Sequence, residues 1–168
     1  DVETGVPGKY ELVLNDNGVP TFESLPAILT LLDSDDAQER AEGANHLATL
    51  VDGSQADDAT ILADYLRESG GIEMLAELLL DAEPYIQQKL LMVLGNVASD
   101  AFDPNSAATK AILKENDVMA RLLPFLTSRE WVTQLYAAAA IQNLSKDVEL
   151  AKEAVTLGTH KAIQRLLR

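Results

Sequence analysis

YAAAAIQNLSKD at residues 136–147 is the third occurrence of one recurring stretch in this chain. KLLMVLGNVASD at 89–100 lies 47 residues earlier, and EGANHLATLVDG at 42–53 lies a further 47 residues earlier. In this alignment Asn143 falls on Asn96. Self-similarity at a fixed period of this length is typical of arrays of stacked helices. The recurring stretch therefore predicts an all-α fold built from repeats.

Other predicted helical segments recur along the chain at similar intervals. Four of them share an apolar pattern that ends in paired large side chains: ESLPAILTLL (23–32), GIEMLAELLL (71–80), DVMARLLPFL (117–126) and GTHKAIQRLL (158–167). A polar turn and a longer helix follow the first three, and the longer helices are expected at 35–51, 83–99 and 129–145. A shorter helix then follows each of these, at 58–69, 106–115 and 148–157. Each unit is predicted to contain three helices, and no strand pattern recurs.

The four alanines at 137–140 fit this scheme as packing residues. Small side chains allow neighbouring backbones to approach closely, while Ile141 and Leu144 fill the core between the layers. We therefore expect neighbours on several sides of this helix.

The first 22 residues differ from the repeats. Pro7-Gly8 and Asn15-Asp16-Asn17-Gly18 are turn signals, and Tyr10 to Leu14 is expected to be a short extended piece. We interpret 1–22 as an N-terminal arm. It either packs over the first repeat as a cap or is tethered to another subunit.

Charge is distributed unevenly along the chain. Residues 1–84 hold 19 Asp or Glu and 3 Lys or Arg, a net charge of −16, and residues 85–168 hold 8 and 10, a net charge of +2, for a total of −14. Such a field repels phosphate backbones, which argues against nucleic acid as a partner. It favours basic proteins or peptides, or it is a solvated surface that keeps the protein soluble.

The sequence contains no recognisable catalytic or cofactor motif. It has no cysteine, no run of eighteen apolar residues and no phosphate-binding or nucleophile-elbow motif. The acidic run Asp33-Ser34-Asp35-Asp36 lacks the glycine and the distal glutamate of an EF-hand loop, and helix capping explains both this run and Asp57-Asp58 better than calcium binding. We therefore expect no enzyme activity, no cofactor and no metal site. The default location of the protein is the cytoplasm or the nucleus. An organelle, reached with a leader that is then removed, is the alternative.

The helical unit resembles the armadillo repeat. GIEMLAELLL followed by IQQKLLMVLGNVASD, and DVMARLLPFL followed by TQLYAAAAIQNLSKD, carry the resemblance. It covers 23–168, with repeats at about 23–70, 71–116 and 117–157 and a partial repeat at 158–168. The resemblance implies a right-handed α-solenoid whose third helices line a concave groove.

Armadillo proteins commonly bind an extended peptide in that groove through an Asn near the end of each third helix. An Asn amide offers a donor and an acceptor that match a peptide unit of any sequence. The resemblance assigns this role to Asn96 and Asn143, with Thr49 in the same column of the first repeat. The same helical face adds the remaining candidates for peptide binding: Asn45, Tyr85, Lys89, Met92 and Tyr136.

Each of these residues also has a structural interpretation. The asparagines can bond a neighbouring turn or repeat, and the tyrosines can lie on the surface with their hydroxyls in water. Trp131 is expected to pack against the preceding turn. The function expected first is a non-catalytic scaffold that binds a protein or an extended peptide. The alternatives are a structural subunit of a larger assembly, held through the arm and an open C-terminal end, and a chaperone cofactor of the exchange-factor type.

Overall fold

The computed structural model describes residues 10–168, so the part of the arm at 1–9, including the Pro7-Gly8 turn, lies outside the described residues. Regular structure in the described part is helical, which confirms the all-α class. The α-helices are α1 (Leu25–Leu32), α2 (Ala37–Gly53), α3 (Asp57–Glu68), α4 (Gly71–Asp81), α5 (Pro84–Val97), α6 (Ser106–Glu115), α7 (Val118–Leu122), α8 (Trp131–Leu144), α9 (Val148–Leu157) and α10 (Thr159–Leu166). Two 3-10 helices complete the set, η1 (Phe22–Ser24) and η2 (Leu123–Thr127).

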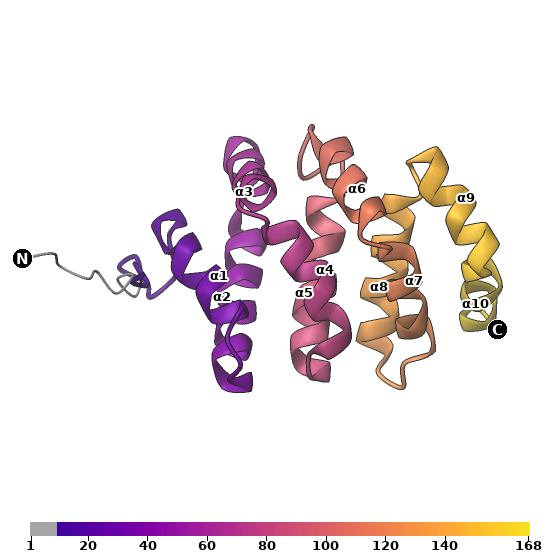
Figure 1. Ribbon diagram of the computed structural model, residues 1–168, viewed down its shortest axis with the longest axis horizontal. Helices are drawn as coiled ribbons and strands as arrows, with labels where there is room; N and C mark the ends of the chain where they lie inside the picture. Colours follow the sequence, from indigo (N-terminus) through magenta and orange to yellow (C-terminus); the bar gives the residue numbers. More distant parts are fainter. Residues whose placement is uncertain (1–9) are drawn as a thin grey trace, which may run out of the picture.

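The helices follow one another in a row, with α1 and α10 toward opposite ends of it (Figure 1). The long helices α2, α5 and α8 pack side by side in chain order. α1 packs on α2, α4 on α5, and η2 on α8, while α3, α6 and α9 lie along the upper edge in Figure 1. Buried apolar side chains run continuously from Leu25 to Ala154, so one core extends through the whole row.

The predicted helices occur at their expected places, with one difference. The segment expected to be helical at 117–126 is α-helical only from Val118 to Leu122 and continues as the 3-10 helix η2. Pro124 is the physical reason, because proline lacks the N–H that an α-helix needs and its ring clashes with the preceding turn. The tighter helix leads into the turn before α8.

Helix caps are confirmed at one of the two acidic runs. The Asp36 side chain accepts hydrogen bonds from the backbone N–H groups of Gln38 and Glu39 and so caps α2. The second run was assigned wrongly, since Asp57 and Asp58 lie inside the first turn of α3 and make no side-chain cap. Carboxylates in a first turn still stabilise a helix through its dipole.

The described part of the arm folds back on the first repeat. The turn at 15–18 is confirmed, with Gly18 at φ +73° and the backbone N–H of Asn15 bonded to the Val19 oxygen at 2.8 Å. Leu14 and Pro20 form an antiparallel bridge, and the buried Ser24 hydroxyl bonds both backbone groups of Val13. Within the described residues, the arm therefore packs against the first repeat.

The four alanines of α8 differ in burial. Ala137 and Ala140 are buried, as expected, but Ala139 is exposed and Ala138 is half-buried. A Cβ placed on Gly95 of α5 would lie 3.6 Å from Ala140, so the small side chains do bring α5 and α8 close together. α8 contacts α5, η2, α7 and α9, so the expected neighbours on several sides of this helix are confirmed, although Ala139 itself is exposed.

A glycine in α2 fixes the approach of α1. A Cβ on Gly43 would lie 2.9 Å from the Leu31 Cβ and 3.0 Å from the Leu32 backbone nitrogen. We therefore expect Gly43→Ala to separate the two helices and to lower the free energy of unfolding by about 1 kcal/mol or more. Gly53→Ala is the matched control in the same helix, because its Cβ would meet nothing within 4 Å. Urea unfolding should show the control unchanged or slightly stabilised, and equal loss in both variants would contradict the close approach.

Candidate functional site

The eight residues proposed for peptide binding all lie on the three long helices that pack side by side. They are Asn45 and Thr49 on α2, Tyr85, Lys89, Met92 and Asn96 on α5, and Tyr136 and Asn143 on α8. The side-chain contacts divide them into two groups and one residue that lies apart.

The first group joins α2 to α5. The Tyr85 hydroxyl donates a hydrogen bond of 2.6 Å to the Oδ1 atom of Asn45. The Lys89 ammonium lies 5.6 Å from the centre of the Tyr85 ring, within the range of a cation–π contact. Half of the Tyr85 side chain stays exposed. Its hydroxyl therefore helps to join two helices, while its ring remains accessible at the surface.

The second group lines a cavity between α5 and α8. Met92 and Asn96 of α5 and Tyr136 and Asn143 of α8 border a space of about 240 Å³. None of the residues that line this cavity is charged at neutral pH. The cavity therefore fits an uncharged side chain better than a charged one.

The two asparagines use their amide nitrogens in different ways. Asn96 Nδ2 donates to the Met92 carbonyl oxygen, one turn back in its own helix, at 2.8 Å. Asn143 Nδ2 donates across to the Gly95 carbonyl oxygen at 3.0 Å and so ties α8 to α5. Among the hydrogen bonds of residues 10–168, neither Oδ1 atom accepts one. Each side chain thus keeps an acceptor beside the cavity.

Thr49 lies apart from both groups. Its hydroxyl donates to the Asn45 carbonyl oxygen at 2.9 Å, and its side chain borders a different cavity of about 490 Å³. That second cavity is formed by the end of α2 and by arm residues, among them Val19 and Phe22. The repeat period could not reveal this neighbour, because the arm belongs to no repeat.

The α5–α8 cavity also includes residues that the sequence analysis did not select. Leu91, Gly95, Ser99 and Ala139 complete its lining. Ser99 follows Asn96 by three positions, so helical spacing was the available signal for it, and the same spacing already places Ala139, four residues before Asn143, on the predicted helical face.

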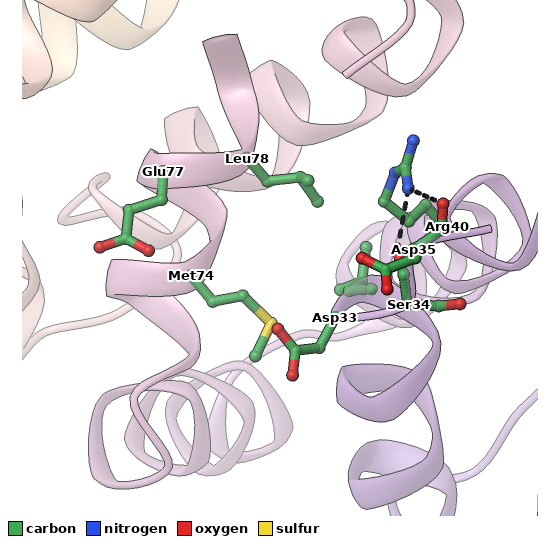
Figure 2. A pocket seen from close by; sticks show the side chains of 8 residues that line it. Asp33, Ser34, Asp35, Arg40, Met74, Glu77 and Leu78 are labelled. Atoms are coloured by element: carbon green, nitrogen blue, oxygen red, sulfur yellow. Dashed lines mark hydrogen bonds between the residues drawn. The ribbon is translucent and has the colours of Figure 1, made fainter. Parts of the chain in front are cut away.

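A further cavity lies between the α1–α2 turn and α4. Its volume is about 320 Å³. Figure 2 shows Met74 and Leu78 of α4 on one side of it and Asp33 and Arg40 on the other. Arg40 Nη1 donates to the carbonyl oxygens of Ser34 and Asp35, both at 2.9 Å. Because this guanidinium group already holds the turn, we assign Arg40 a structural role.

Two charged clusters involve α6: one joins α6 to the loop before it, and the other joins α6 and that loop to α3. Asp100 accepts from Lys110 at 2.7 Å and from Ser106, and these bonds lower the pKa of its carboxyl group to about 2. Arg67 of α3 binds the buried Asp103 at 2.6 Å, Thr109 of α6 at 2.8 Å, and Asp64. Burial alone would lower the pKa of Arg67, but the hydrogen bonds and charges of Asp103 and Asp64 raise it.

Residues 10–168 contain no group of three or more His, Asp or Glu side chains placed to hold a metal ion. Over the same part of the chain, none of the helices has the length and apolar character needed to span a bilayer.

Comparison with known proteins finds similar structures but no function. No family model and no curated protein matches the chain. Crystal structures of two engineered proteins, both targets of the Northeast Structural Genomics Consortium, are similar to it, with TM-scores of 0.71 and 0.72. Each is 25% identical to this chain and covers 85% of it, while the chain spans 54% of one and 33% of the other.

Proposed function

We propose that residues 23–168 form a right-handed α-solenoid of armadillo-like repeats that binds an extended peptide, or an extended segment of a protein, across α2, α5 and α8. The observation that carries the proposal is the cavity between α5 and α8, where four of the eight expected residues meet. The function is that of a non-catalytic scaffold.

The peptide is held in two ways. Its backbone N–H groups donate to the free Oδ1 atoms of Asn96 and Asn143, which works for any peptide sequence. One uncharged side chain enters the α5–α8 cavity and displaces water from its apolar walls. A groove on packed helices is rigid before binding, so little conformational entropy is lost when the peptide docks.

Charge determines which part of the bound peptide lies near which helix. The first half of the chain has a net charge of −16, so basic residues of the peptide lie toward α2 and its uncharged residue lies toward α8. This arrangement combines the acidic half with an uncharged cavity in one binding surface.

A second function, as a structural subunit of a larger assembly, is favoured by one observation. Leu135 and Val155 are exposed apolar side chains that border one cavity between α8, α9 and α10. Contiguous apolar surface of this kind usually marks a protein contact.

Asn96→Ala tests the peptide-binding proposal with little effect on folding. The amide bonds only its own helix, and alanine has the higher helix propensity, so stability should not fall. Peptides selected from a random library on the wild-type protein should bind the variant about fivefold more weakly, the loss expected for one hydrogen bond of about 1 kcal/mol. Fluorescence polarisation measures this change.

Asn116→Ala is the matched control. Asn116 directly follows α6, and its Nδ2 donates to the Ile112 carbonyl oxygen, one turn back, at 2.9 Å, but it does not border the cavity. Affinity should stay within twofold of the wild type. Equal losses in the two variants, or a library that yields no binder, would count against the proposed groove.

A further inference from the structure

The N-terminal arm and the end of α2 border a cavity of about 490 Å³. The arm contributes Val19, Pro20 and Phe22 to its lining, and α2 contributes Thr49 and Leu50. We call this space the arm cavity. Its volume is in the range of pockets that bind organic ligands.

The arm cavity is acidic. Glu23 of η1 and Asp58 of α3 belong to its lining, and both residues are exposed. Among the described residues, no Lys, Arg or His lines the cavity. Within residues 10–168, neither carboxylate takes part in an ion pair. Both carboxylates are therefore available to a cation that enters from solvent.

The surrounding sequence supplies no counter-charge for these carboxylates. Residues 10–66 contain 12 Asp or Glu and a single Lys or Arg, which is Arg40. The guanidinium group of Arg40 is held in the α1–α2 turn by the carbonyl oxygens of Ser34 and Asp35. Because the fields of like charges add, this part of the molecule attracts cations.

The arm cavity also has an apolar wall. Pro20 is buried, Phe22 is half-buried and Val19 is 36% exposed. The Leu14–Pro20 bridge and the hydrogen bond from Asn15 to the Val19 oxygen hold this wall in place. Lys and Arg carry a charged group on an aliphatic stem, and such stems pack along apolar surface. The lining thus matches both parts of a long basic side chain.

A metal ion fits the arm cavity less well. Calcium takes about six to eight oxygen ligands, several of them carboxylate oxygens. Over residues 10–168, no group of three or more His, Asp or Glu side chains is placed to hold a metal ion. The lining therefore favours an organic cation.

Thr49 connects the arm cavity with the proposed peptide surface. It lies in the same column of the long helices as Asn96 and Asn143, and it borders the arm cavity. Since α2, α5 and α8 pack side by side, a peptide that follows this column from α8 reaches α2 at Thr49. One of its side chains can enter the cavity there.

We propose that the arm cavity binds the side chain of one Lys or Arg residue of the peptide held across α2, α5 and α8. Glu23 and Asp58 bind its charged group, and Val19, Pro20 and Phe22 contact its stem. This assignment rests on the proposed function. It makes the arm, which belongs to no repeat, the part of the protein that selects a basic residue.

Two peptides serve as probes. The first is a peptide selected from the random library on the wild-type protein, and it should carry Lys or Arg at one position that is enriched among the selected sequences. The second has norleucine at that position, which keeps the aliphatic stem and removes the charge. Fluorescence polarisation should show that the norleucine peptide binds the wild-type protein at least tenfold more weakly, because a charge-assisted contact is lost.

The double variant Glu23→Gln/Asp58→Asn locates the contact. It should bind the basic peptide at least tenfold more weakly than the wild type does, and it should bind the norleucine peptide within twofold of the wild type. Such a difference isolates the interaction between the basic side chain and the two carboxylates from any effect on folding.

Glu11→Gln/Asp57→Asn is the matched control. Glu11 of the arm and Asp57, the first residue of α3, are exposed and do not line the arm cavity. Their replacement removes the same net charge as the test variant does. The control should bind the basic peptide within threefold of the wild type.

The outcomes separate this proposal from the proposed function. Selected peptides without an enriched basic position, or a norleucine peptide that binds as tightly as its parent, would overturn the arm-cavity proposal alone, provided that Asn96→Ala still weakens binding. Equal losses in the two double variants would also overturn it, since the overall field and not the cavity would then attract the peptide. A library that yields no binder would overturn both proposals.

Discussion

Replacing Asp103 by alanine is expected to lower the free energy of unfolding by about 3 kcal/mol. Asp103 is fully buried, and its carboxylate binds the Arg67 guanidinium, whose side chain is only 10% exposed. Without Asp103, the guanidinium group of Arg67 remains charged in a mostly buried environment and loses its buried partner, which destabilises the folded state. The bond matters for the whole row because Arg67 lies on α3 and Asp103 lies in the loop before α6, so it joins the first repeat to the second.

Asp64→Ala is the control for this effect. Asp64 binds the same guanidinium group, but its side chain is 48% exposed. An exposed ion pair contributes about 1 kcal/mol or less, so this variant should be close to the wild type in urea unfolding. Pairing Arg67→Met with Asp103→Leu should recover part of the loss, because no charge is then left buried. A loss from Asp103→Ala no larger than that from Asp64→Ala would show that the buried pair does not join the repeats.

Ala140→Leu is expected to lower stability, whereas Ala139→Leu is expected to weaken peptide binding, although the two alanines are neighbours in the sequence. Ala140 is buried and contacts Gly95, so a leucine there forces α8 away from α5 and lowers the free energy of unfolding by about 2 kcal/mol. Ala139 is exposed and borders the α5–α8 cavity, so a leucine there leaves stability within about 0.5 kcal/mol. Its side chain fills the cavity instead, and we expect peptide binding to fall at least tenfold.

Urea unfolding and peptide titration of both variants give the comparison. Peptide binding by Ala139→Leu at wild-type affinity would show that the cavity is not the binding site. Wild-type stability of Ala140→Leu would show that α5 and α8 are not closely packed.

Much of the helical structure could be predicted from the sequence because it depends on local patterns that repeat. The period of 47 residues placed α2, α5 and α8, and turn residues such as Asn15 to Gly18 placed the arm's turn. Pro124 is a local signal that was not used, and it changes the predicted helix at 117–126 into α7 and η2.

The contacts between repeats could not be predicted in this way. Asn143 bonds a carbonyl group 48 residues back, and Tyr85 bonds Asn45, 40 residues back. Such pairs depend on how far neighbouring helices are shifted along their axes, which no local pattern encodes. The same limit explains Trp131, which was expected to pack on the preceding turn and is instead 69% exposed at the start of α8.

The most direct test of the proposed function is a titration of the ¹⁵N-labelled protein with a peptide selected from the random library, followed by amide chemical shifts. Our account predicts that the shifts occur on α2, α5 and α8 and are largest on residues 85–97 of α5 and 132–144 of α8, around the Asn96 and Asn143 side chains. Shifts confined to α3, α6 and α9, with α5 and α8 unchanged, would contradict it.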